Sequence, residues 1–63
     1  MRLSLRQARR LKDKTQEEMA NLLGIHIQTY RKIEETPSIA TIEQAKKISE
    51  YLEFPYDEIF FNF

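Results

Sequence analysis

Residues 15–34, with the sequence T-Q-E-E-M-A-N-L-L-G-I-H-I-Q-T-Y-R-K-I-E, constrain the fold more than any other part of the chain. Thr15 and Glu18 are three residues apart, which is the spacing of a capping box at the start of a helix. Apolar residues at helical spacing follow, and Gly24, the only glycine of the chain, comes directly after them. A helix commonly ends in a left-handed residue, for which glycine is the best choice. The pattern therefore predicts a helix over residues 16–23 that ends in a turn.

A second amphipathic segment begins after this turn. Tyr30 and Ile33 are three residues apart, so they share one face of a helix predicted over residues 27–34. Ala20 is small, which allows the two helices to cross closely. The angle between them is expected to be filled by Met19, Leu23, Ile25, Tyr30 and Ile33. Two short helices joined in this way form a helix-turn-helix.

The composition favours one all-α domain spanning residues 1–63, because helix formers dominate and glycine and proline are scarce. The absence of cysteine excludes a disulfide framework, and a lone histidine is not expected to bind a metal. One glycine cannot build a glycine-rich phosphate loop, so we expect neither an enzyme nor a cofactor. No apolar run approaches the roughly 20 residues of a membrane span, and the N-terminus lacks the apolar region of a signal peptide.

Two further capping boxes predict helices on either side of the helix-turn-helix. Ser4 and Gln7 mark the start of a helix over residues 5–12, and Thr41 and Gln44 mark the start of another. The inner faces of these helices are expected to be formed by Leu5, Ala8 and Leu11 in the first, and by Ile42, Ala45, Ile48, Tyr51 and Leu52 in the second.

The patterns T-Q-E-E-[apolar]-A, L-G-I and T-Y-x-K-I-E resemble the DNA-binding helix-turn-helix of phage repressor and Cro proteins, the XRE-type regulators. The resemblance extends over about residues 5–60. It implies a compact five-helix domain in which helices 2 and 3 form the helix-turn-helix, with Ile59 and Phe60 of a short last helix pointing inward. It also implies a sequence-specific transcription regulator, a repressor or Cro-like protein, that binds a palindromic operator in double-stranded DNA in the bacterial cytosol.

The predicted third helix supplies the candidates for base contacts. If it lies in a major groove, its first turn meets base edges. Gln28 is suited to adenine, Arg31 to a bidentate contact with guanine, and Ile27 to a thymine methyl group. The alternative for Ile27 is a place in the core, if the helix is rotated.

The DNA backbone is expected to be held by Gln16, His26, Thr29, Lys32, Arg10, Lys14 and Ser38. The resemblance implies this role for Gln16, and free N–H groups at the start of its helix also attract a phosphate. The alternative is that Gln16 is simply a good first-turn residue. His26 is a poor N-cap and is expected to contact the DNA backbone or water.

The resemblance further implies an ion pair between Arg9 and Glu34 that joins the first helix to the third. Breaking a largely buried pair of this kind from one side costs roughly 3–5 kcal/mol. The alternative is that Arg9 is an exposed surface residue.

The charge distribution weakens the electrostatic part of this interpretation. The net charge is zero, although residues 1–14 carry six basic residues and one acidic residue. The segment between Lys32 and Lys46, where the family carries a basic loop, contains no lysine or arginine, and Thr36 replaces the loop glycine. Affinity for DNA falls when fewer phosphates are neutralised. Two alternatives therefore stay open: an antitoxin-type regulator, and a helix-turn-helix module that binds a protein instead of DNA.

The C-terminal sequence F-F-N-F is unusually apolar for the end of a small domain. A clustered apolar end is typical of an interface, and members of the family often dimerise through their last helix. We therefore predict a homodimer whose interface includes Phe61, Phe63 and Tyr56, with recognition helices roughly 34 Å apart. The alternative is that the phenylalanines fold back onto the first or last helix.

Overall fold

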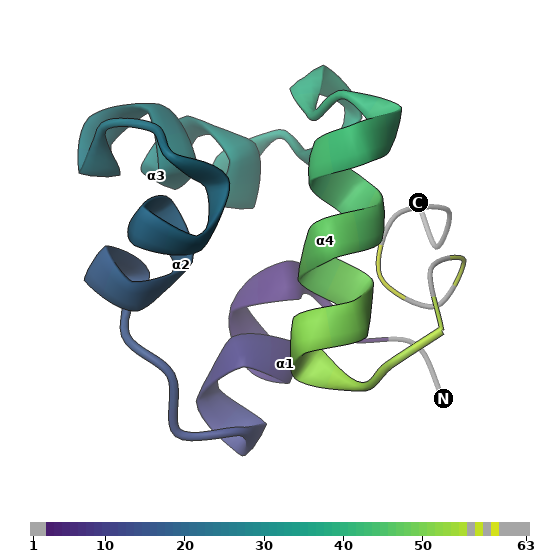
Figure 1. The fold of residues 1–63 in the computed structure, drawn as a ribbon. Helices are drawn as coiled ribbons and strands as arrows, with labels where there is room; N and C mark the ends of the chain where they lie inside the picture. Colours follow the sequence, from purple (N-terminus) through teal and green to yellow (C-terminus); the bar gives the residue numbers. More distant parts are fainter. Residues whose placement is uncertain (1–2, 56, 58, 60–63) are drawn as a thin grey trace.

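A computed structural model describes residues 3–55, 57 and 59 of the chain. The ordered elements are α1 (Leu5–Leu11), α2 (Gln16–Leu23), α3 (Ile27–Glu35), the 3-10 turn η1 (Pro37–Ile39) and α4 (Ile42–Leu52). Figure 1 shows α2 and α3 together on one side of the molecule and α4 on the other. The described residues contain no strand, so the all-α class is confirmed.

The expectation of five α-helices is not met within the described residues, which form four α-helices and the turn η1. The fifth helix was expected in residues 56–60, and only Asp57 and Ile59 of that segment are described. Ile59 is buried, as the sequence predicts, whereas Phe60 lies outside the described residues.

Each of the three predicted capping boxes is present. In each one, a hydroxyl of the N-cap accepts from the backbone N–H three residues later, and a side-chain oxygen of that later residue accepts from the N-cap N–H. These reciprocal pairs satisfy donors that the first turn of a helix leaves free. They join Ser4 to Gln7 in α1, Thr15 to Glu18 in α2, and Thr41 to Gln44 in α4.

Three helices end in the same way, with a residue in the left-handed conformation. These residues are Asp13 at φ 56°, Gly24 at φ 66° and Glu53 at φ 59°. In each case the next backbone N–H donates to a carbonyl five residues earlier: Lys14 to Arg9, Ile25 to Ala20, and Phe54 to Ser49. The paired bonds define Schellman ends, at which glycine is preferred. Only one of the three ends has it.

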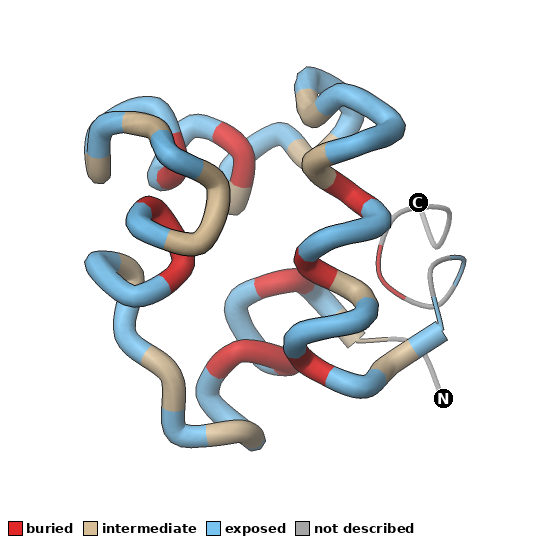
Figure 2. The backbone as a smooth tube through the Cα atoms, viewed as in Figure 1, coloured by how far each residue is buried: buried red, intermediate tan, exposed pale blue. Residues whose placement is uncertain are grey.

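The core lies where the four α-helices face the centre of the molecule, as Figure 2 shows. Its fully buried large side chains are Tyr30, Leu5, Met19, Ile33, Ile48, Leu52 and Ile59. The small residues Ala8, Ala20 and Ala45 complete it and let the helices approach closely. This core fixes the angle between α2 and α3, and so it fixes the surface that the two helices present.

Three residues expected in the core lie outside it. Leu11, Ile42 and Tyr51 are exposed, by 64%, 69% and 36%. In α4 the buried stripe runs through Ala45 and its neighbours at helical spacing, and Ile42 and Tyr51 each lie about a quarter turn from its centre, on opposite sides. The spacing of the apolar residues predicted the helix correctly. These residues cover a wider part of the helix surface than the core does.

Candidate nucleic-acid interface

Helix α3 presents a polar face opposite its buried one. Tyr30 and Ile33 point into the core, and the residues on the outer side are all exposed. The outer residues are Gln28, Thr29, Arg31, Lys32 and Glu35. Helix α2 packs against α3 across the Gly24 turn and holds this face outward. The arrangement is a helix-turn-helix whose second helix carries hydrogen-bonding and basic side chains to solvent.

Ile27 differs from the other residues proposed for base contacts. It is half-buried and packs against the hydrophobic core, whereas Gln28 and Arg31 are exposed. The structure thus gives Ile27 the packing role that the sequence left as an alternative. Contact with a base through its remaining exposed surface stays a prediction.

Arg9 connects α1 to the end of α3 and to the turn before α2. Its Nε donates to Glu34 Oε2 at 2.6 Å, and its Nη1 donates to the Lys14 carbonyl at 2.8 Å. Arg9 is only 8% exposed, so the guanidinium lies inside the fold and not on its surface. One side chain therefore fixes the end of α3 and the turn that leads into α2.

Glu34 is the centre of this cluster of polar groups. Besides Arg9, its carboxylate accepts a hydrogen bond from Gln16 Nε2 at 3.1 Å, and the Arg6 Nε lies 3.9 Å away. Burial alone would raise the pKa of Glu34, but Arg9, with Tyr30 and Gln16, outweighs it and holds the pKa below its ordinary value. Glu34 is therefore an ionised carboxylate at neutral pH.

The Tyr30 hydroxyl is buried beside this cluster. It has no hydrogen-bond partner of normal geometry among the described residues. Its burial, and then the negative charge of the nearby Glu34 carboxylate, raise the pKa of the Tyr30 phenol far above its ordinary value. The phenol stays neutral and serves as part of the core.

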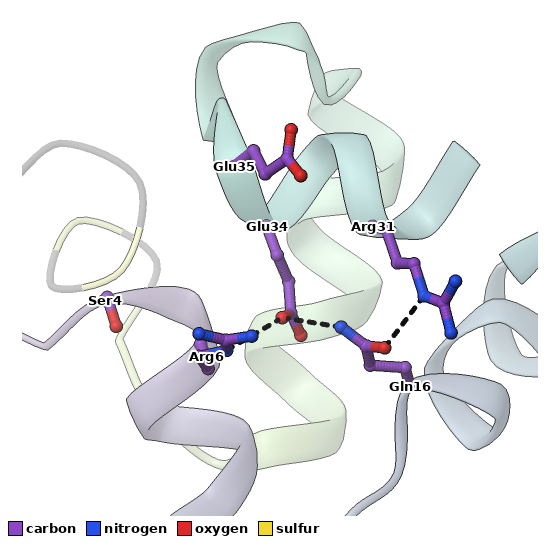
Figure 3. Close-up of a pocket in the computed structure, with 6 residues that line it drawn as sticks. All are labelled: Ser4, Arg6, Gln16, Arg31, Glu34 and Glu35. Atoms are coloured by element: carbon purple, nitrogen blue, oxygen red, sulfur yellow. Dashed lines mark hydrogen bonds and ion pairs between the residues drawn. The ribbon is translucent and has the colours of Figure 1, made fainter. Parts of the chain in front are cut away.

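Gln16 connects this cluster to the exposed face of α3. Its Oε1 accepts a hydrogen bond from the Arg31 Nε at 3.1 Å, while its Nε2 donates to Glu34. Figure 3 shows the resulting chain of contacts from Glu34 through Gln16 to Arg31. The two roles expected of Gln16 from the sequence were a contact with the DNA backbone and that of a first-turn residue. Nothing in the spacing of residues 16 and 31 signals their contact, because it depends on how α2 and α3 cross.

A polar cavity of about 550 Å³ opens over this chain of contacts. It is lined by Ser4, Arg6, Gln16, Arg31, Glu34 and Glu35. Two guanidinium groups and two carboxylates face it, so the cavity suits a polar or ionic group (Figure 3). No group of three or more possible metal ligands occurs among the described residues.

His26 has a structural role that was not expected from the sequence. The backbone at His26 is extended and its Nδ1 accepts from the Gln28 backbone N–H at 3.2 Å, so the imidazole is the N-cap of α3. The expectation that His26 is a poor cap was therefore wrong. An imidazole nitrogen that carries no hydrogen is an acceptor, and one acceptor is sufficient for capping.

The lysines of the α1–α2 turn lie over aromatic rings near the end of α4. Lys12 Nζ is 5.2 Å from the centre of the Phe54 ring, and Lys14 Nζ is 5.0 Å from that of Tyr51. Such contacts stabilise a cation by about 0.5–1 kcal/mol at exposed sites. Lys14, proposed for a phosphate, is thus partly engaged within the molecule.

The remaining candidates for the DNA backbone lie on three different elements. Arg10 and Ser38 are exposed, on α1 and in η1, while Thr29 and Lys32 are exposed on α3. The dimer candidates Tyr56, Phe61 and Phe63 lie outside the described residues. Within the part of the chain that is described, no helix is long and apolar enough to cross a membrane.

Comparison with known proteins adds one match. A family model described as helix-turn-helix matches residues 5–59, which is most of the chain. Among curated proteins nothing matches the sequence, and the same is true of solved structures. The matched range includes α1 to α4 and therefore the whole cluster around Glu34.

Proposed function

The chain belongs to the helix-turn-helix family of DNA-binding transcription regulators, and from that premise we propose that it binds a specific operator by laying α3 in the major groove. The observation that carries the proposal is the division of α3 into a buried face and a polar one. Tyr30 and Ile33 hold the helix to the core, and Gln28, Arg31 and Lys32 are left exposed. A helix held in this way can reach base edges with the side chains of its outer face.

Four of the exposed side chains of α3 have a role in the proposal. Gln28 pairs with adenine and Arg31 with guanine, because the amide and the guanidinium match the major-groove edges of those bases. Lys32 and Arg10 neutralise phosphates, and the hydroxyls of Thr29 and Ser38 donate hydrogen bonds to phosphate oxygens. Phosphate contacts fix the orientation of the protein, and base contacts give the sequence preference.

The proposal includes a symmetric dimer and a palindromic operator, as in a phage repressor or Cro protein. Tyr56, Phe61 and Phe63 are the proposed interface. Two copies related by a two-fold axis would place their α3 helices one DNA turn apart, roughly 34 Å. Sedimentation at tens of micromolar tests this part by itself. A monomer whose behaviour is unchanged by deletion of residues 61–63 would contradict it.

One observation favours a second function, a protein-binding module without DNA affinity. The segment that follows α3 carries two exposed isoleucines, Ile39 at 53% and Ile42 at 69%, in a stretch with no lysine or arginine. Exposed apolar residues are suited to a protein partner, whereas a phosphate contact requires cations or hydrogen-bond donors.

Selection of bound duplexes from a random pool at low salt separates the two functions. The DNA-binding function predicts an enriched palindrome and an affinity that falls steeply as salt rises. Recovery of no consensus, with no salt-dependent retention of any duplex, would contradict it and favour the protein-binding module.

A further inference from the structure

We propose that Gln16 is a positioning residue for Arg31, and that it directs the two terminal nitrogens of Arg31 toward a guanine. This inference rests on the proposed function, since it concerns how the operator is read. It assigns Gln16 a role in base preference, in addition to the backbone contact expected for it. The supporting geometry is a chain of hydrogen bonds that begins at a buried ion pair and ends at an exposed arginine.

The orientation of the Gln16 amide is dictated by its two neighbours. Glu34 Oε1 can only accept a hydrogen bond, and Arg31 Nε can only donate one. The amide therefore turns its nitrogen to Glu34 and its oxygen to Arg31, both at 3.1 Å. The reverse orientation would place an oxygen against a carboxylate and an N–H against a guanidinium, so it is unfavourable at both ends.

The fixed end of the chain lies inside the protein. The side chains of Arg9 and Glu34 are 10% and 5% exposed, and their contact is 2.6 Å long. Because Glu34 cannot move without breaking this pair, it holds Gln16, and Gln16 in turn limits the rotamers of Arg31. An exposed arginine is ordinarily free to move, and binding must then restrict it. Here part of that restriction exists before DNA binds.

The contact also determines which edge of Arg31 is left for a ligand. Gln16 occupies Nε, so the N–H groups of Nη1 and Nη2 remain available as a parallel pair of donors. In Figure 3 these terminal nitrogens lie on the side of the guanidinium away from the amide. A parallel pair of donors matches O6 and N7 of guanine. The geometry therefore favours guanine over the other bases.

The competing role for Gln16 is a phosphate contact through its second amide hydrogen, which Glu34 does not use. A phosphate contact and a positioning role predict different results. Loss of a phosphate contact weakens binding to all duplexes alike, because phosphates carry no sequence information. Loss of positioning weakens binding only where Arg31 meets its guanine.

The test measures affinity for the selected operator and for altered operators. The altered operators carry another base in place of the guanine at which Arg31→Ala loses its preference. Gln16→Met keeps the length of the side chain and removes both hydrogen bonds. We expect about tenfold weaker binding to the guanine operator, and a change within about twofold for the altered operators. In the Arg31→Ala background, Gln16→Met should add less than about twofold. Asn21→Met is the matched control, because Asn21 is a neutral, exposed residue of the same helix α2. A uniform loss on every duplex, additive with R31A, would overturn the proposal.

A measurement without DNA separates failure of this inference from failure of the proposed function. In the free protein, the NMR signal of the Arg31 Nε–H should be protected from solvent exchange, and Gln16→Met should remove that protection. A wild-type signal that exchanges as fast as that of Arg10 overturns the positioning role, whatever the protein binds. A protected signal in a protein that selects no duplex overturns the DNA-binding function, and with it the assignment of guanine.

Discussion

Arg9 and Glu34 are 25 residues apart in the sequence and form an ion pair of 2.6 Å that is nearly closed to solvent. The pair joins α1 to the end of α3, and the second contact of Arg9, to the Lys14 carbonyl, adds the turn before α2. The guanidinium of Arg9 therefore fixes the orientation of the helix-turn-helix relative to α1, together with the core that the helices share.

Removal of Arg9 should destabilise the fold strongly. Arg9→Met leaves the Glu34 carboxylate buried without its main partner, at a cost of roughly 3–5 kcal/mol. Urea denaturation followed by circular dichroism measures the loss. Arg10→Met is the matched control, because Arg10 is the exposed neighbour in the same helix and should change stability by no more than about 0.5 kcal/mol. Equal losses in the two variants would show that the ion pair contributes nothing specific.

Stability should fall in acid partly through Glu34. Its pKa is lower in the folded protein than in the unfolded chain, where it is about 4.3. The unfolded chain therefore takes up the proton first, so the stabilisation is complete above about pH 4.3 and is lost as the pH falls through the lower folded value. Thermal unfolding of wild type and Glu34→Gln between pH 6 and pH 2 measures this difference. The variant should show the weaker pH dependence, and parallel curves would contradict the assignment.

Glycine at position 53 should stabilise the protein. Glu53 ends α4 with φ 59°, a conformation that costs a residue with a Cβ about 1 kcal/mol relative to glycine. Glu53→Gly should therefore raise the free energy of unfolding by about 0.5–1 kcal/mol. Glu50→Gly removes the same charge from within α4 and should lower it by a similar amount. If both variants are destabilised, the left-handed end of α4 is not as described.

Alanine at positions 28 and 31 should remove operator preference and leave the fold intact. Each bidentate base contact contributes about 1–3 kcal/mol of discrimination, so Gln28→Ala and Arg31→Ala should each relax preference at one base position. Lys32→Ala should instead weaken binding to all duplexes and reduce the salt dependence. Competition binding against single-base variants of the selected operator distinguishes the two patterns. Full affinity and preference in both alanine variants would mean that α3 is not the recognition helix.

The sequence predicted those parts of the structure that depend on local signals. The capping boxes at Ser4, Thr15 and Thr41 mark the starts of α1, α2 and α4, and Gly24 marks the end of α2. These features depend only on residues that are close together in the chain, so they can be predicted directly from the sequence. The buried faces of α2 and α3 followed from the same periodicity.

Contacts between helices were harder to predict. The bond between Gln16 and Arg31 depends on the crossing angle of α2 and α3, which no spacing encodes. The exposure of Ile42 depends on how far the core extends along α4, and the packing of Ile27 depends on the rotation of α3. Arg9 and Glu34 were paired through a family resemblance and not through periodicity. Geometry between helices thus had to come from the structure.

The cation-free segment after α3 also affects how the protein would search a chromosome. Every stretch of duplex offers phosphates, so a domain rich in cations spends most of its time on the wrong sequences. In this chain no lysine or arginine lies between Lys32 and Lys46. If the domain reads an operator, its residence on random DNA is short and occupancy of the true site depends on a few base contacts. Such a regulator would dissociate quickly from its operator, and its action would be readily reversed.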